Sequence, residues 1–285
     1  ATRHWTGKEQ GLLGVIEVDG VSYRFMGKEA PEEGTPVRFE KAAVQQSVNV
    51  LPTQTYYTFE CGPVCLDLIF TSPLLLNDLD RMSTPVNYIS WQVRATDGKT
   101  HETRLTVEAS PSLAVHSDDQ AVTVAFEEEN GISYVKAGTV EQSVLARKGD
   151  DVRIDWGYFY LAARTEKQTE MKVSDRQQLV YSRDMGMVSD SPQSGFLMVG
   201  YDDLYSIQYF KDNRMGYWKH NGKKNIRQAF EGSAEEYRSV MDRCRHFDTR
   251  LMEDAEEAGG KEYADLCAVA YRQAVAAHKL IEDKD

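Results

Sequence analysis

Alternation of apolar and polar residues through the first two-thirds of the chain restricts it to a β-rich fold. In LLGVIEVDGVSYRFMG, two alternating segments meet at Asp19-Gly20, a dipeptide that favours a two-residue hairpin turn. Similar pairs of segments meet at Gly62-Pro63, Asp97-Gly98 and Asn130-Gly131. Four such pairs, with almost no helical periodicity, predict four hairpins within a large antiparallel β-sandwich and more than a third of all residues in strands.

Two further segments of this region are less regular. Residues 152–163, VRIDWGYFYLAA, predict another long strand that is rich in aromatic residues. Residues 163–178, ARTEKQTEMKVSDRQQ, fit a short helix or a loop equally well. The β-sandwich domain is therefore expected to span residues 1–212.

The pattern changes after about residue 212. Residues 213–232 are mostly polar with Gly and Asn punctuation, which predicts a linker. Ser233 with Glu236 three residues later forms a capping box, so a helix is expected to start there. Its apolar stripe at helical spacing consists of Tyr237, Val240, Met241, Cys244, Phe247 and Leu251. Gly259-Gly260 should end this helix, and a second should run from about Lys261 to Ile281, so that residues 233–285 form a helical hairpin.

The second predicted helix carries apolar residues on more than one face, as a helix with several neighbours does. Two explanations fit this pattern. Its many alanines are good helix formers in any setting. Alternatively, the hairpin is the first part of a larger helical domain.

Charge and hydropathy exclude two classes of partner. A net charge of −12 argues against binding to nucleic acid or to anionic membranes. No stretch approaches the roughly 20 apolar residues of a transmembrane helix. The first ten residues lack the apolar centre of a signal peptide, and this leaves export open.

The cysteines and histidines indicate neither a metal site nor a cofactor. Cys61 and Cys65 would lie beyond disulfide reach on one extended strand unless Gly62-Pro63 turns the chain, so buried free thiols are expected for all four cysteines and the redox state stays open. No Cys/His spacing matches a zinc site, and no phosphate-binding glycine loop occurs. The histidines considered as possible metal ligands are expected to be solvated or partly packed. They are His101, His116, His220, His246 and His278.

Several long blocks carry a resemblance to a known family. They are TRHWTG (2–7), VDGVSYRFMG (18–27), the run from LPTQTYYTFECGPVC to VNYISWQV (51–93), YDDLYSIQYF (201–210) and CRHFDTRLMEDAEEAGGKEYADLCAVAYRQAVAAHKL (244–280). In this order they resemble the glutaminase A family of secreted fungal and bacterial proteins. The resemblance implies a β-sandwich followed by a helical toroid of the six-hairpin type, of which only the start matches here.

This resemblance implies hydrolysis of L-glutamine to glutamate and ammonia by the intact protein, and a secreted or periplasmic location. The chain would be an inactive fragment whose partners are a small-molecule or carbohydrate substrate and the remainder of its own toroid, with self-association through the last helix. The alternative is an accessory, carbohydrate-binding sandwich of a six-hairpin glycoside hydrolase-like protein. Exposed aromatic residues, for which WGYFYLAA supplies candidates, would favour this alternative.

No standard catalytic signature is present, so no catalytic residue is assigned. Asp202 and Asp203 are adjacent, and on a strand they would point to opposite faces, which excludes an acid–base pair. They either cap local backbone amides or, with Tyr201 or Tyr205, line the mouth of the toroid as substrate-binding residues.

Arg272 and Gln273 are the second candidate substrate-binding group. Arg272 lies among apolar neighbours on the last helix, so its guanidinium needs partners. It either forms a structural salt bridge to an acid of the preceding helix, such as Asp248, or faces a cavity and binds a carboxylate of the substrate.

Overall fold

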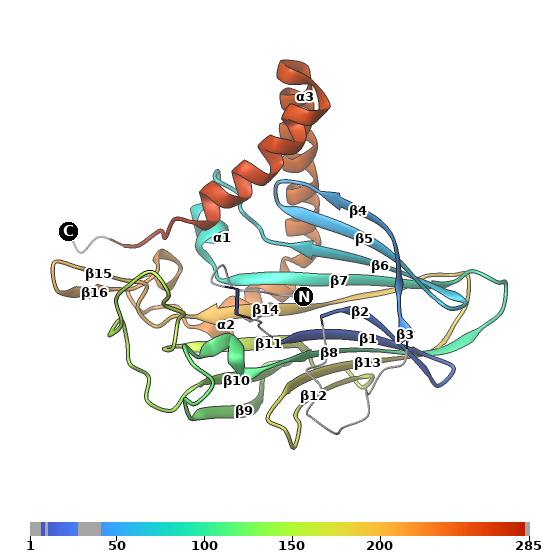
Figure 1. Ribbon diagram of the computed structural model, residues 1–285, viewed down its shortest axis with the longest axis horizontal. Coiled ribbons are helices and arrows are strands. Elements are labelled where there is room, and N and C mark those ends of the chain that lie inside the picture. The colour runs from blue at the N-terminus through green and yellow to red at the C-terminus, as the bar shows by residue number, and fades with distance from the viewer. Residues whose placement is uncertain (1–6, 9–10, 28–40, 283–285) are drawn as a thin grey trace.

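The computed structural model describes residues 7–8, 11–27 and 41–282 (Figure 1). Strands account for 43% of the structure and helices for 24%, which confirms a mainly β fold. Two β-sheets face each other, and helices near the C-terminus cover the outer face of the larger sheet.

The smaller sheet has six strands in the order β12-β13-β8-β1-β2-β3. These strands are β1 (Leu12–Val18), β2 (Val21–Met26), β3 (Lys41–Ala42), β8 (His101–Ala109), β12 (Thr169–Val173) and β13 (Leu179–Val188). All neighbours are antiparallel except β2 and β3. The β1–β2 hairpin turns at Asp19-Gly20, where both residues have positive φ, as the sequence predicts.

The larger sheet has eight strands in the order β4-β5-β6-β7-β14-β11-β10-β9, all antiparallel. These strands are β4 (Val44–Val50), β5 (Gln54–Cys61), β6 (Val64–Thr71), β7 (Val86–Ala95), β9 (Val122–Glu129), β10 (Ile132–Thr139), β11 (Tyr158–Arg164) and β14 (Gln193–Asp202). The predicted turns at Gly62-Pro63 and Asn130-Gly131 join β5 to β6 and β9 to β10.

The structure differs from the sequence predictions at three places in the sandwich. The segments around Asp97-Gly98 are not a hairpin, because β7 pairs with β6 and β14 in one sheet while β8 pairs with β1 and β13 in the other. The chain therefore crosses between the sheets here. The aromatic strand predicted from residue 152 begins only at Tyr158, and the undecided segment 163–178 contains strand β12.

The remaining elements are short except for the last two helices. They are α1 (Leu79–Ser83), η1 (Pro111–Ala114), β15 (Ile207–Tyr209), β16 (Asp212–Arg214), η2 (Tyr217–Lys219), α2 (Ile226–Glu235) and α3 (Tyr237–Ala276). The predicted helix start at Ser233 is wrong, because a reciprocal capping box of Asn225 and Gln228 already begins α2. Much of the range predicted as a linker is therefore occupied by β16, η2 and α2.

Helix α3 is divided in two by Gly260, whose φ of 78° is outside the helical range. The rings of Phe247 and Tyr271, one from each half, lie 5.1 Å apart between their centroids. The second half therefore folds back on the first, which confirms the predicted helical hairpin at Gly259-Gly260 (Figure 1). The helix ends at Ala276 and not at Ile281.

The central strands of the larger sheet are buried on both faces, whereas its edge strands β4 and β9 are largely exposed. Alternate residues of β7 show this: Trp91 belongs to the core between the sheets, and Tyr88 to the core beneath the helices. In that second core, Phe230 of α2 has no exposed surface and packs against Tyr134 and Tyr160. The helices are thus a third layer of one folded unit.

All four cysteines are free, and three of them are buried, while Cys267 is partly exposed. The turn at Gly62-Pro63 does fold β6 back on β5. Cys61 pairs across the hairpin with Val64, however, whereas Cys65 pairs with Glu60, so the two thiols lie on opposite faces of the sheet. Burial raises the pKa of Cys61 to about 12, as expected for an inert core thiol.

Two glycines of the helical layer should respond oppositely to alanine. We expect Gly260→Ala to lower the free energy of unfolding by about 1–2 kcal/mol, because a Cβ at positive φ is strained even where no atom is near. Gly232→Ala, inside α2 with open space around it, should raise it by about 0.5–1 kcal/mol. Urea denaturation of both variants measures this, and a neutral Gly260→Ala would contradict a strained positive-φ backbone at this residue.

Candidate functional site

The end of β14 brings four of the predicted site residues together: Tyr201, Asp202, Asp203 and Tyr205. Asp202 is the last residue of the strand and pairs with Tyr158 of β11. The backbones approach so closely here that a Cβ on Gly157, with φ of 76°, would lie 2.1 Å from the carbonyl oxygen of Asp202. Gly157 is therefore required for this junction.

Each of the two carboxylates is held by its own lysine. The Asp202 Oδ1 atom lies 2.6 Å from Lys219 Nζ of η2, and both side chains are 10% exposed. The Asp203 Oδ2 atom lies 2.9 Å from Nζ of Lys279, which follows α3. These different partners agree with the argument that adjacent aspartates cannot act as one acid–base pair.

Both aspartates also make local hydrogen bonds. The Leu204 amide donates to Asp202 Oδ1 at 2.9 Å, and the Ser206 hydroxyl donates to Asp203 Oδ2 at 2.8 Å. Such contacts are typical of aspartates that fix a turn. The pair thus fastens the turn after β14, the η2 segment and the segment after α3 to one point.

The two tyrosines of this group are tied to the same loop through Trp156. The Tyr201 hydroxyl donates to the Trp156 carbonyl at 2.8 Å, and the Trp156 indole N–H donates to the Tyr205 carbonyl at 3.1 Å. Burial raises the pKa of Tyr201 well above its usual value. Its hydroxyl is therefore a neutral donor at physiological pH.

Arg272 is separate from this group and binds backbone carbonyls. Its Nε donates to the carbonyl oxygens of Leu51 at 2.6 Å and Pro52 at 3.2 Å, in the turn between β4 and β5. Asp248, on the first half of α3, accepts from the amide and the hydroxyl of Thr53 in the same turn, both at 2.8 Å. Gln273 is exposed.

The sequence carries a signal for the buried role of Asp248. Met241, Cys244 and Asp248 lie at helical spacing on the buried side of α3, and Asp248 is 1% exposed. An acid in an apolar stripe indicates a buried polar contact. No local pattern, however, identifies Thr53 as its partner, because 195 residues separate the two.

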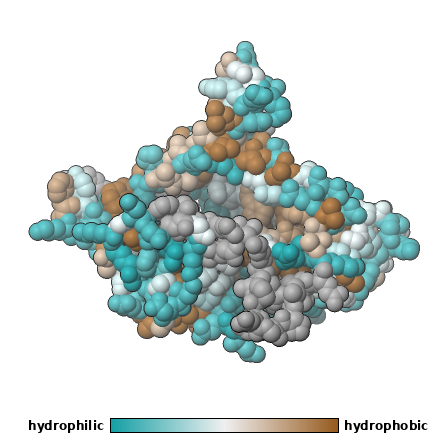
Figure 2. All heavy atoms as spheres, in the orientation of Figure 1, coloured by the Kyte–Doolittle hydropathy of each residue, from teal (hydrophilic) through white to brown (hydrophobic). Residues whose placement is uncertain are grey.

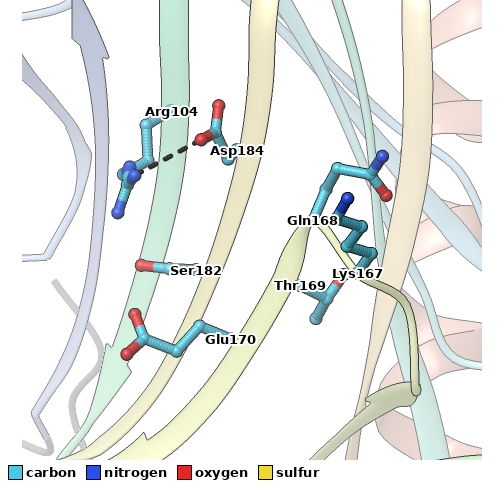
Figure 3. A pocket seen from close by; sticks show the side chains of 7 residues that line it. All are labelled: Arg104, Lys167, Gln168, Thr169, Glu170, Ser182 and Asp184. Carbon is cyan, nitrogen blue, oxygen red and sulfur yellow. Dashed lines mark hydrogen bonds and ion pairs between the residues drawn. The ribbon is translucent and has the colours of Figure 1, made fainter.

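A groove lies on the smaller sheet and is lined by none of the predicted site residues (Figure 3). Its volume is about 380 Å³, and its lining residues are Arg104, Lys167, Gln168, Thr169, Glu170, Ser182 and Asp184. Arg104 and Asp184 point toward each other across neighbouring strands at 3.4 Å. Charges of both signs neutralise one another here, and the lining has no aromatic side chain, so the groove gives no clear ligand class.

His101 forms a third cluster of titratable groups, and its environment corrects the expectation of a solvated or partly packed histidine. Its side chain is buried, with Nδ1 2.6 Å from Asp19 Oδ2 and Nε2 3.0 Å from Asp97 Oδ1. Hydrogen bonds to Asp97 and Asp19 raise the pKa of His101, and the same contacts lower the pKa values of both carboxyls. The cluster joins the β1–β2 turn to the connection between the sheets.

Within the described ranges, no group of three or more His, Cys, Asp or Glu side chains is arranged to hold a metal ion. No helix in that part of the chain is both long and apolar enough to cross a membrane.

Two family models match the chain. The model described as a domain of unknown function, DUF5127, matches residues 53–180 and 165–254, and the chain belongs to this family. A second domain of unknown function, DUF4964, matches residues 1–33.

The chain is also similar to Glutaminase A of Aspergillus oryzae, with 23% identity over 321 residues. The similarity covers 97% of this chain but 43% of the relative, so the chain spans less than half of that relative's length. This supports weak homology to glutaminase A over most of the chain.

Among solved structures, a putative kojibiose phosphorylase from the human microbiome is similar with a TM-score of 0.50 and 8% identity. The match covers 91% of this chain and 31% of the other. At this identity the likeness shows a shared fold and nothing about the substrate.

The two aspartates should differ in their contribution to stability. We expect Asp202→Asn to lower the free energy of unfolding by about 3 kcal/mol, because it leaves the buried charge of Lys219 without its partner. Asp203→Asn should cost only about 1 kcal/mol, since Lys279 is 60% exposed and water can replace the carboxylate. Chemical denaturation measures both, and equal losses would contradict this assignment.

The His101 cluster should make stability depend on pH. Because the folded-state pKa of His101 is raised, the stabilisation is fully present below its unfolded value of about 6.5 and is lost as the pH rises through the folded value. We therefore expect the Tm difference between wild type and His101→Gln to be larger at pH 5.5 than at pH 8.5. The exposed His246, changed to Gln, is the control and should show no such difference.

Proposed function

We propose that this chain is the sandwich and first helical hairpin of a glutaminase-like hydrolase and is inactive by itself. The observation that carries this proposal is the similarity to Glutaminase A along 97% of the chain but only 43% of the relative. In the whole protein, L-glutamine would be hydrolysed to glutamate and ammonia. A six-hairpin toroid would surround the substrate, and the resemblance to secreted proteins supports a secreted or periplasmic location.

An exposed apolar face on the second half of α3 supports the idea that further helices pack here. Tyr263, Leu266 and Val269 follow one another at three-residue spacing and are 48%, 64% and 41% exposed. Ala264 and Ala268 on the other side of the same helix are buried. Figure 2 shows hydrophobic side chains on the visible face of α3 above the sheets. We propose that the remaining toroid covers this face, and that isolated chains associate through it.

We propose that the six predicted site residues act mainly by positioning. Asp202 and Asp203 are already occupied by lysines, and Arg272 by carbonyl oxygens. These contacts fix the helical hairpin and the segment after it against the sandwich. Tyr201 and Tyr205 support the same junction through Trp156, while Gln273 is exposed and free to face a neighbouring helix.

A carbohydrate-binding sandwich is the second candidate. The aromatic residues of WGYFYLAA do not favour it, because Phe159 and Tyr160 are buried. A different observation does: Tyr209 and Phe210, at the tip of the projecting β15–β16 hairpin, are 54% and 86% exposed with their ring centroids 4.5 Å apart (Figure 1). Exposed aromatic faces can stack on sugar rings.

Ammonia release and light scattering test the first candidate together. We expect the purified 285-residue chain to release no ammonia from L-glutamine and to self-associate. Leu266→Asp should shift it toward the monomer, whereas Val140→Asp, which changes an equally exposed apolar residue outside α3, should not. Turnover by a monodisperse monomer would contradict the proposal. Calorimetric titration with oligosaccharides, in wild type and Phe210→Ala, tests the second candidate.

A further inference from the structure

One three-residue turn is held by both halves of the helical hairpin. Asp248 on the first half of α3 binds the amide and hydroxyl of Thr53, and Arg272 on the second half binds the carbonyls of Leu51 and Pro52. In the turn between β4 and β5, the hydrogen-bond donors are therefore bound by the Asp248 carboxylate and the carbonyl acceptors by the Arg272 guanidinium. This arrangement fixes the hairpin on the sandwich.

The Asp248 carboxylate does not have its full set of hydrogen bonds. Its Oδ1 accepts two hydrogen bonds, but its Oδ2 is buried and has no hydrogen-bond partner among the described residues. Arg272 is near enough to influence Asp248 electrostatically, but no ion pair within 4 Å joins the two side chains in that part of the chain. A buried oxygen in this state is costly while it carries negative charge.

The groups that face Asp248 come from three elements. Arg272 and Tyr271 belong to the second half of α3, Cys244 precedes Asp248 by one turn, and Tyr56 is on β5. Of these, only Arg272 is charged at neutral pH, since burial raises the pKa values of the thiol and both phenols. Burial also raises the pKa of Asp248 to about 6, although the Thr53 hydrogen bonds, Arg272 and the backbone amide of Gln54 act in the opposite direction.

We propose that the protonation state of Asp248 sets how tightly the helical hairpin is held on the sandwich. When the carboxyl is neutral, its burial costs little and the hairpin is firmly docked. When it is ionised, Oδ2 carries negative charge without a hydrogen-bond partner among the described residues, and opening of the junction to water becomes easier.

The direction of the pH effect follows from proton binding. A carboxyl exposed by opening has a pKa near 3.9, whereas the docked carboxyl has a value of about 6. The docked state therefore binds more protons between these values, and docking weakens as the pH rises through this range. For these two values, the opening constant should rise about tenfold between pH 5 and pH 7.

Hydrogen–deuterium exchange measures this opening directly. We expect protection factors of peptides covering the Leu51–Thr53 turn and residues 240–250 to fall about tenfold from pH 5 to pH 7, after correction for intrinsic exchange. A peptide from β8 in the smaller sheet is the internal control and should not change in this way. In Asp248→Asn, which keeps the acceptor for Thr53 but cannot ionise, the tenfold change should disappear.

A second variant distinguishes a pH-dependent contact between Asp248 and Thr53 from one that is merely structural. Thr53→Val keeps the backbone amide but removes the hydroxyl that favours the ionised carboxylate. The midpoint of the pH dependence should therefore move to higher pH, whatever the variant's overall stability. The same pH dependence in wild type and Asp248→Asn, or an unmoved midpoint in Thr53→Val, would overturn the proposal.

Discussion

The outer face of the eight-stranded sheet is the constraint on which the rest of the structure depends. Tyr88, Tyr134 and Tyr160 make this face aromatic, and burying such rings stabilises any layer that covers them. Phe230 fills the space above Tyr134 and Tyr160, and Gly200 leaves room for it, because a Cβ there would lie 2.9 Å from the Phe230 ring. The Tyr88 hydroxyl also contacts the helical layer, since it donates to the carbonyl of Ser233 in α2. The helices are therefore a necessary layer of the domain.

Burial of apolar side chains stabilises the packing of the helices on the sheet, and polar contacts fix the position of the helices. Apolar surfaces have little directional preference, whereas hydrogen bonds and ion pairs fix distance and angle. Two groups of such contacts lie between the sandwich and the helical hairpin or the segments next to it. The Leu51–Thr53 turn is bound by Asp248 and Arg272, and the end of β14 holds one lysine on each carboxylate of its aspartate pair. Both groups lie between segments that are remote in sequence, so they form only when the layers are assembled.

The similarities to known proteins also separate the fold, which depends on the layers, from the chemistry, which depends on particular residues. A fold shared at 8% identity with the putative kojibiose phosphorylase shows that two very different sequences can satisfy the same layer pattern. The chemistry must come from particular residues, and the resemblance to glutaminase A gives the direction for that proposal. The exposed apolar face of Tyr263, Leu266 and Val269 supports the proposal that further helices cover α3.

The sequence by itself determined the elements whose chemistry is local. Asp19-Gly20 and Asn130-Gly131 form hairpins because their residues adopt positive φ readily, and Gly260 reverses α3 for the same reason. Tertiary structure alone decided that Asp97-Gly98 connects two sheets, because turn residues do not specify a strand's partners. It also supplied the partners of the aspartate pair: Lys279 lies 76 residues beyond Asp203. Contacts between residues so far apart in the sequence depend on how whole layers pack. No local residue spacing specifies that packing.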